Sequence, residues 1–237
     1  MKTNTLILGS SSGIGFFACK YFLKKGHCVV GVSRKLTKIK SKKFQHISFD
    51  LNNFDEYEVL FKKIYKKFGK IQNILFSAGV QFLIPTSIIS GKHIDKILNI
   101  NLKFPLMFAK FISNKKYFKR PGSVVFISSA IATRPSSGQS IYSSSKSGIN
   151  NLVKTLALEV SKYKITVNSV SPGMIKSPML SKYSEYITKD FFDKVTNQHP
   201  LGLGKFEDVV NAIDFLFKKE SKWITGINLM VDGGYNI

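Results

Sequence analysis

The sequence predicts an α/β protein in which a parallel, doubly wound sheet of seven strands carries helices on both faces. Apolar runs of strand length alternate with segments of helical period along almost the whole chain. Small residues follow several of these runs, where a ligand or a tight turn needs space. The 237 residues show no repeat or linker, so we expect one domain, 1–237.

The expected strands are 5–8, 28–32, 46–49, 73–76, 123–128, 165–170 and 224–231. The expected helices are 16–25, 55–68, 90–114, 142–163 and 206–218. Ligands in such sheets collect beyond the carboxyl ends of the strands. We interpret 1–100 as mainly a dinucleotide-binding half and 101–237 as a catalytic half. Within the second half, 174–204 lacks a strong period and is expected to cover the substrate.

Composition places the chain among globular proteins, because 43% of its residues are hydrophobic. No apolar run approaches the ~20 residues that span a bilayer, and the N-terminus lacks a signal peptide, so a cytoplasmic location is expected. We expect Cys19 and Cys28 to be small buried hydrophobes in a reducing compartment, in preference to a disulfide. The four histidines lack ligand spacing, so no metal site is inferred.

The formal charge of +22 is the unusual feature of the composition. One interpretation is attraction to phosphates, an acidic carrier protein, nucleic acid or a membrane surface. The other is a lysine-rich surface that reflects biased base composition. The lysines are spread along the whole chain, which favours the second interpretation.

A glycine-rich turn follows the first expected strand at once and leads into a helix. Glycines let the backbone approach a pyrophosphate, and free N–H groups at the helix start bind its charge. The alternative is a plain tight turn. The residues expected at the cofactor are Gly9, Ser11, Ser12, Gly13, Ile14 and Gly15.

The second strand ends at Ser33, Arg34 and Lys35, where the choice between nicotinamide cofactors is usually made. An NAD site wants a carboxylate there, and an NADP site wants a cation. Residues 1–49 contain no Asp or Glu, and Arg34 can form a fork onto a phosphate. A solvated basic loop is the alternative, but the missing acid favours NADP(H).

Two further strand ends are expected near the cofactor. Asp50 and Leu51 would lie by an adenine ring, although Asp50, like Asn53, could also cap the next helix. The small residues Ser77, Ala78 and Gly79 follow the fourth strand and suit close approach of a ligand, as they would suit a turn.

The stretch 129–146 carries the expected catalytic groups. Tyr142 and Lys146 are four residues apart, so on a helix they share one face. Ser129 stands at the carboxyl end of the fifth strand. A hydroxyl, a phenol and an ammonium together can polarise a carbonyl and deliver a proton to it. Asn101 lies in an apolar helical stripe, and Pro105 opposes its carbonyl, so it is either a structural amide or a group that holds a water at a kink.

In combination these residues resemble the short-chain dehydrogenase/reductase family, over positions 6–234, with its Rossmann-like fold. The resemblance rests on the glycine turn 9–15, Asp50-Leu51, Ala78-Gly79, Asn101, Ser129, Tyr142, Lys146, Asn168, Pro172-Gly173, Ile175 and Ser177.

The resemblance implies roles. Tyr142 would be general acid in reduction and base in oxidation, and Lys146 would hold the nicotinamide ribose and lower the pKa of the phenol. Ser129 would bind the substrate oxygen, and Asn101 a water that relays protons. Pro172, Gly173, Ile175 and Ser177 would lie at the nicotinamide end. Family members commonly form homotetramers or dimers through the helices that carry Asn101 and Tyr142.

Within the family the chain is most similar to 3-oxoacyl-[acyl-carrier-protein] reductases, through Gly138-Gln139 and the segment 223–226. Arg120 matches a position that those enzymes use to dock an acidic carrier, whereas Tyr163 stands at a second, normally basic one. Departures at Leu8, Asn73 and 76–77 suggest a diverged member with its own substrate. The implied activity is NADPH-dependent reduction of a carbonyl, of a 3-oxoacyl thioester or else of a sugar, polyol or small ketone. The alternative of another class is a catalytically idle NADP-binding or nucleic-acid-associated module.

Overall fold

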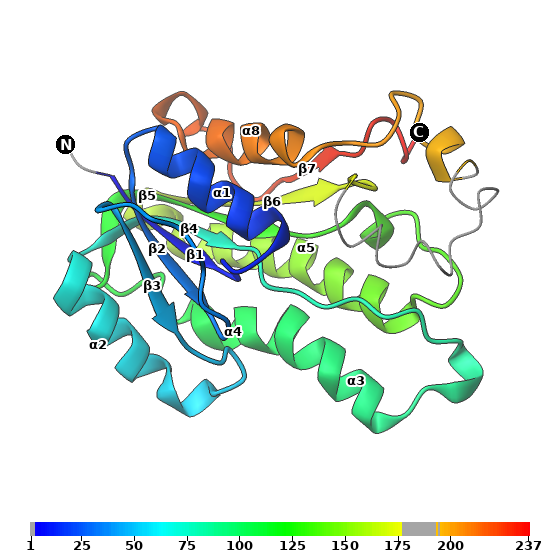
Figure 1. The fold of residues 1–237 in the computed structure, drawn as a ribbon, viewed down its shortest axis with the longest axis horizontal. Helices are drawn as coiled ribbons and strands as arrows, with labels where there is room; N and C mark the ends of the chain where they lie inside the picture. The colour runs from blue at the N-terminus through cyan, green and yellow to red at the C-terminus, as the bar shows by residue number, and fades with distance from the viewer. Residues whose placement is uncertain (1–2, 177–192, 194) are drawn as a thin grey trace.

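The computed structural model describes residues 3–176, 193 and 195–237. Seven parallel strands form one sheet in the order β3-β2-β1-β4-β5-β6-β7, which is the predicted doubly wound arrangement (Figure 1). The strands are β1 (Asn4–Leu8), β2 (Cys28–Ser33), β3 (Phe44–Ser48), β4 (Ile71–Phe76), β5 (Phe118–Ile127), β6 (Ile165–Pro172) and β7 (Asn228–Val231). From β1 the strands are added first on one side of the sheet, as β2 and β3, and then on the other side, from β4 onward. The boundary between β1 and β4 is the switch point, where such sheets bind ligands.

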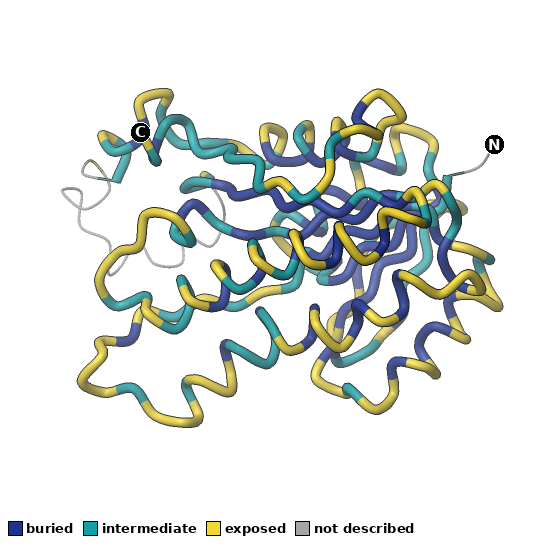
Figure 2. Tube along the Cα trace, turned by 180° about the vertical axis from the view of Figure 1, so that it is seen from behind, coloured by how far each residue is buried: buried dark blue, intermediate teal, exposed yellow. Residues whose placement is uncertain are grey.

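The helices cover both faces of the sheet. The α-helices that lie wholly within the described residues are α1 (Gly13–Lys24), α2 (Tyr57–Phe68), α3 (Gly91–Leu98), α4 (Phe104–Ala109), α5 (Ser140–Val160) and α8 (Phe206–Phe217). One hydrophobic core joins α1 and α8 to the sheet, and a second joins α2, α4 and α5 to its other face (Figure 1). Figure 2 shows buried strands between helices whose outer sides are exposed. Burial on both faces explains why the strands read as continuous apolar runs and not as alternating patterns.

Three elements differ most from the sequence prediction. β5 begins at Phe118, five residues before the expected start at 123. The last strand begins at Asn228, not at 224, because Gly226 has a φ of +76° and Asn168 binds the backbone of Ile224 and Ile227. The expected helix 90–114 is divided, since a π-helical turn, Asn99–Lys103, separates α3 from α4. The sequence predicted an irregularity at this place from Pro105.

The structure bears on two further expectations, about the cysteines and about membrane-spanning helices. Both cysteines are buried and free, and burial raises the pKa of the Cys19 thiol to about 12. Within residues 3–176, 193 and 195–237, no helix is both long and apolar enough to span a membrane.

Candidate active site

The glycine turn between β1 and α1 is packed backbone against backbone. Gly9 has a φ of +94°, and a Cβ there would lie 2.5 Å from the Ala78 nitrogen. A Cβ on Gly15 would lie 2.1 Å from the Gly9 carbonyl oxygen. Both positions therefore require glycine for space, and Gly9 requires it for conformation as well. Ala78 and Ser77 after β4 close the other side of this cradle, since the Ser77 hydroxyl would lie 3.1 Å from a Cβ on Gly15.

The amino end of α1 is open to an anion. Ser12 is its cap residue and makes no side-chain hydrogen bond to the helix, and the first turn holds no acid. Gly13, with a φ of +55°, faces open space. The first backbone N–H groups of a helix have no partner within it and carry a partial positive charge. The turn thus fits the pyrophosphate of a dinucleotide.

At the end of β2 a group of hydroxyls braces the loop that carries the expected cations. The Ser33 hydroxyl lies 3.1 Å from the Ser10 hydroxyl and 3.0 Å from His46 Nε2, and it donates to the Lys35 carbonyl at 2.9 Å. Thr37 joins the group at 3.1 Å from Ser10. Arg34 and Lys35 are exposed on the same loop. Sequence reasoning missed Ser10, Thr37 and His46, whose contacts join separate strands and loops.

The structure of the Asp50-Leu51 segment after β3 shows whether Asp50 or Asn53 caps the next helix. The Asp50 carboxylate accepts a hydrogen bond from the Asn52 nitrogen at 3.0 Å, within its own turn. A 3₁₀ turn, Phe54–Glu56, precedes α2, and its cap residue Asn53 makes no side-chain cap bond. Asp50 therefore caps no helix, and Leu51 beside it is buried.

Ser129, Tyr142 and Lys146 lie together beyond the carboxyl end of β5. Ser129 begins a short 3₁₀ turn, Ala130–Ala132. The Ser147 hydroxyl fastens this turn to α5 by donating to the Ala132 carbonyl at 2.8 Å. The Tyr142 phenol lies close enough to the Ser129 side chain to influence its pKa, so the predicted juxtaposition is present in the structure.

Lys146 is held from behind by the sheet. Its side chain is only 4% exposed, and its Nζ donates to the Ile127 carbonyl at 2.8 Å. The same ammonium lies 5.8 Å from the centre of the Tyr142 ring. A Cβ on Gly79 would be 3.4 Å from Lys146 Nζ and equally far from Asn101 Oδ1, so Gly79 leaves room for both groups.

Asn101 is 1% exposed and lies in the π-helical turn. Its Oδ1 accepts from the Val80 nitrogen at 2.8 Å, and its Nδ2 donates to the Val80 carbonyl at 2.9 Å. A further bond of 3.1 Å runs from Nδ2 to the Ser145 hydroxyl on α5. The amide thus joins the loop after β4 to the helix that carries Tyr142. These hydrogen bonds agree with the first of the two alternatives for Asn101, a structural amide.

The electrostatics of the pair correct one expectation. Burial raises the pKa of the Tyr142 phenol, and the hydrogen bond with Ser129 opposes that rise in part. The Lys146 charge, which was expected to lower the phenol pKa, is not among the causes. Burial instead lowers the pKa of Lys146 to about 8. Desolvation is thus the largest influence on the pKa of both groups.

This shift predicts a pH dependence of stability. In the unfolded chain Lys146 keeps its ordinary pKa of 10.5, so between about pH 8 and 10.5 the unfolded state binds more protons than the folded state. Stability contributed by this residue therefore rises with pH across that window. We expect the free energy of unfolding of wild type, relative to Lys146→Met, to increase by about 2–4 kcal/mol. Urea unfolding at several pH values measures it, and parallel curves for the two proteins would contradict it.

The loop after β6 lies beside the catalytic group at the same edge of the sheet. Gly173 donates from its nitrogen to the Val231 carbonyl at 3.1 Å, and Ile175 pairs with Gly204. Ser177 and most of the segment 174–204 lie outside the described residues. Asn168 lies within β6, and its side chain binds the 224–227 turn, so its contacts are structural.

Arg120 and Tyr163, the two positions compared with a carrier-docking pair, are in contact. The guanidinium carbon of Arg120 lies 3.7 Å from the centre of the Tyr163 ring, and Nη2 donates to the Ser113 carbonyl at 2.9 Å. They lie at the amino end of β5, away from Ser129. A hollow of about 350 Å³ beside them is lined by Lys70, Lys115, Phe118, Lys119 and Arg120.

Comparison with known proteins supports the fold and the family. A family model described as "Enoyl-(Acyl carrier protein) reductase" matches residues 9–236. The 3-oxoacyl-[acyl-carrier-protein] reductase FabG of Buchnera aphidicola subsp. Acyrthosiphon pisum is 32% identical over 241 residues, covering 98% of this chain and 97% of that protein.

Two solved structures of similar fold contain a nicotinamide cofactor. ElxO with NADP bound is 27% identical, with a TM-score of 0.89 and 99% of both chains covered. 4-Hydroxyisoleucine dehydrogenase complexed with NADH is 26% identical, with a TM-score of 0.89 and 99% and 98% covered. By sequence, fold and similarity, the chain belongs to the short-chain dehydrogenase/reductase family of oxidoreductases, which act on alcohol and carbonyl groups.

Proposed function

We propose that this protein is an NADPH-dependent carbonyl reductase whose substrates are 3-oxoacyl thioesters. The observation that carries the proposal is the placement of the Tyr142 phenol close to Ser129, with the buried Lys146 held behind it by the Ile127 carbonyl. A site built only to bind a nucleotide would not need a proton donor held at this point by two other elements. The similar sequence of a 3-oxoacyl-[acyl-carrier-protein] reductase supports the substrate class.

The chain's own residues supply position and protons. Bound NADPH would supply hydride to the carbonyl carbon. Ser129 would donate a hydrogen bond to the substrate oxygen and orient it toward the phenol. Tyr142 would transfer its proton to that oxygen, which carries negative charge as the carbon is reduced. Lys146 would bind the nicotinamide ribose, and its charge would stabilise the phenolate left behind. Asn101 would keep Val80 and α5 in register. We also propose that it binds a water that relays protons.

The cofactor residues fit the proposal. The cradle of Gly9, Gly15 and Ala78 with the open end of α1 would hold the pyrophosphate. Asp50 and Leu51 would lie at the adenine, and Pro172, Gly173 and Ile175 at the nicotinamide.

NADPH is proposed over NADH because Arg34 and Lys35 are exposed at the end of β2 and residues 1–49 hold no carboxylate. We expect Arg34→Ala to raise the Kd for NADPH by about 10- to 100-fold, the worth of charge-assisted hydrogen bonds, and to change the Kd for NADH less than about twofold. Fluorescence titration of the reduced cofactors measures both constants. Lys24→Ala, a lysine at the far end of α1, is the control for lost charge. Equal weakening of the two cofactors would refute the assignment of Arg34.

The activity itself is tested by following NADPH oxidation with acetoacetyl-CoA, and with a panel of sugars, polyols and small ketones. Turnover of the thioester alone supports the proposed substrate class. Turnover of another ketone alone keeps the carbonyl reductase and replaces the substrate. NADPH binding without turnover of any carbonyl compound would favour the idle binding module.

For partners, we propose an acidic acyl carrier protein at the basic hollow beside Arg120. Lysines surround Arg120 there, although its guanidinium is also engaged by Tyr163 and Ser113. Comparing Lys119→Glu and wild type on the carrier-bound and CoA-bound thioester tests this, because only the carrier substrate should suffer. Two buried, free cysteines are compatible with the reducing cytoplasm that we propose as its compartment.

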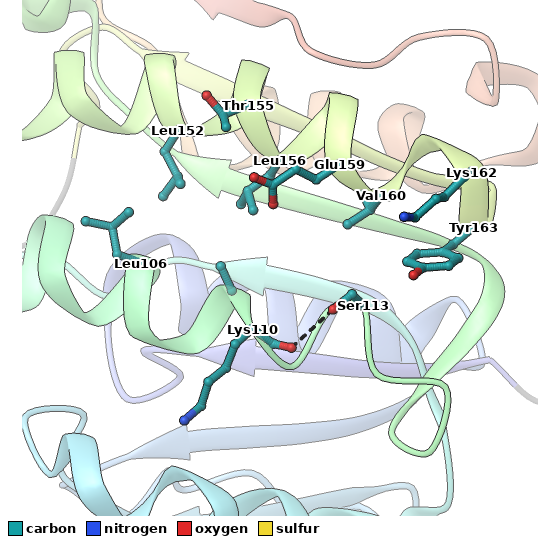
Figure 3. Close-up of a pocket in the computed structure, with 11 residues that line it drawn as sticks. Leu106, Lys110, Ser113, Leu152, Thr155, Leu156, Glu159, Val160, Lys162 and Tyr163 are labelled. Atoms are coloured by element: carbon teal, nitrogen blue, oxygen red, sulfur yellow. Dashed lines mark hydrogen bonds between the residues drawn. The ribbon is translucent and has the colours of Figure 1, made fainter.

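A homotetramer, or a homodimer, is proposed through α4 and α5. Between these helices lies a hollow of about 610 Å³, lined in part by Leu106, Leu152 and Leu156 (Figure 3). Leu106 and Leu158 expose large apolar side chains on the same two helices. A second copy would cover this surface, and light scattering of the purified protein would test it.

A further inference from the structure

His199 is a buried side chain that the proposed mechanism does not use, and it contacts the loop after β6 directly. It is 4% exposed. Its Nε2 lies 3.0 Å from the Met174 nitrogen, and its Nδ1 lies 2.8 Å from the Val195 carbonyl oxygen. The ring therefore bridges the first residues after Gly173 and a segment more than twenty residues later in the chain.

These two contacts define the state of the imidazole. A backbone nitrogen can only donate, so Nε2 must accept from Met174 and carries no proton. A carbonyl oxygen can only accept, so Nδ1 carries the proton and donates to Val195. The ring is therefore neutral and of one tautomer, and both of its nitrogens are used. A substituted residue at position 199 that has no acceptor atom near the place of Nε2 would leave the Met174 N–H without this partner.

The C-terminal segment presses the ring against the loop. The imidazole stacks on Tyr235, with centroids 4.9 Å apart and planes 27° from parallel. The Tyr235 carbonyl in turn accepts a hydrogen bond from Arg134, five residues after Ser129. A Cβ on Gly173 would lie 2.9 Å from His199 Nε2 and 2.8 Å from the Asp232 Cα. Gly173 is thus clamped between His199 and the C-terminal turn.

A backbone bridge anchors the same loop further on. The Gly204 nitrogen donates to the Met174 carbonyl at 3.0 Å, and the Lys176 nitrogen donates to the Gly204 carbonyl at 2.9 Å. His199 fixes the opposite side of the Met174 residue, at its nitrogen. Together the two anchors set the direction of the peptide planes from Gly173 to Ile175, which is the stretch proposed above to receive the nicotinamide.

We infer that His199 is a positioning residue, which holds the loop 173–176 in the conformation that receives the nicotinamide half of the cofactor. The inference rests on the proposed function, since that function places the nicotinamide at this loop. Without the imidazole acceptor, the loop would populate other conformations, and the apparent affinity would fall with the fraction that remains competent.

Two probes separate positioning from general destabilisation. NADPH contains the nicotinamide half, whereas 2′,5′-ADP contains only the adenosine half with its 2′-phosphate. We expect His199→Leu to raise the Kd for NADPH about tenfold and to leave the Kd for 2′,5′-ADP within about twofold of wild type. His199→Gln, whose amide oxygen can accept from Met174, should recover most of the NADPH affinity.

A matched control is available in His27. It too is hydrogen-bonded, to the Thr5 hydroxyl at 2.9 Å, and it stacks on Phe22 with centroids 5.1 Å apart, but it lies at the amino end of β2. His27→Leu should lower Tm without changing the Kd for either probe. If His199→Leu binds NADPH like wild type, or weakens both probes alike, the inference is refuted.

A result on wild type alone covers the case in which His199→Leu does not fold. In ¹⁵N NMR the unprotonated Nε2 of His199 should respond to NADPH and not to 2′,5′-ADP, and absence of any response to NADPH would refute the inference. Wild type that binds neither probe would overturn the proposed function and the inference together. Wild type that binds NADPH while His199→Leu is unaffected would overturn the inference alone.

Discussion

Tyr142→Phe is expected to lower kcat for carbonyl reduction by about a thousandfold or more, while the Kd for NADPH stays near that of wild type. The substitution removes one oxygen atom and leaves the ring in place on α5. It eliminates the proposed proton donor and its interaction with the Ser129 side chain.

The measurement is NADPH oxidation with whichever carbonyl substrate the panel identifies, together with titration of NADPH binding. Tyr163→Phe provides the control, since it removes a tyrosine hydroxyl just beyond the other end of the same helix. That variant should turn over like wild type. A Tyr142→Phe enzyme that keeps more than about a tenth of the wild-type kcat would contradict the assigned acid.

The raised pKa of the Tyr142 phenol is consistent with its proposed role as a proton donor. A phenol whose pKa is raised by burial is protonated at neutral pH, which is the form that reduction consumes. Oxidation of an alcohol would need the phenolate, and burial disfavours it. The phenol therefore holds the proton that reduction would consume. To serve as a base, it would need the Lys146 charge to stabilise its phenolate.

Much of the site could be predicted from the sequence because its residues lie where strands end. An apolar run followed by Gly9, by Ala78-Gly79 or by Ser129 marks the carboxyl edge of a parallel sheet, and those edges meet in space. The helical spacing of Tyr142 and Lys146 placed both on one face. An irregularity near Asn101 could be expected because Pro105 opposes the Asn101 carbonyl, but its π-helical form could not.

What could not be predicted depends on contacts between distant segments. Ser10, Thr37 and His46 form a hydroxyl and imidazole group only after β1, β2 and β3 pair. His199 meets Met174 and Tyr235, which lie 25 and 36 positions away, so no local pattern indicates its role. The pKa of Tyr142 depends on how much solvent the fold excludes, and the sequence motif alone suggested the opposite direction.

Gly15→Ala is expected to weaken NADPH binding by about a hundredfold and to lower Tm by roughly 6–12 °C. The added methyl group would lie 2.1 Å from the Gly9 carbonyl oxygen, and a backbone atom cannot move away as a flexible side chain could. The turn must open, which costs about 3 kcal/mol at a tightly packed position. Gly9 would then be displaced from Ala78, and the cradle that fits the pyrophosphate would lose its shape.

Gly91→Ala is the matched control, because Gly91 also lies in the first turn of a helix, but a Cβ there meets nothing within 4 Å. It should leave NADPH affinity unchanged and Tm unchanged or slightly raised, since alanine favours helix more than glycine does. Calorimetry and cofactor titration on both variants distinguish crowding from helix propensity. If Gly15→Ala bound NADPH as tightly as wild type, the contact between the glycine turn and Ala78 after β4 would not shape the cofactor site, and the pyrophosphate would have to bind elsewhere at this edge.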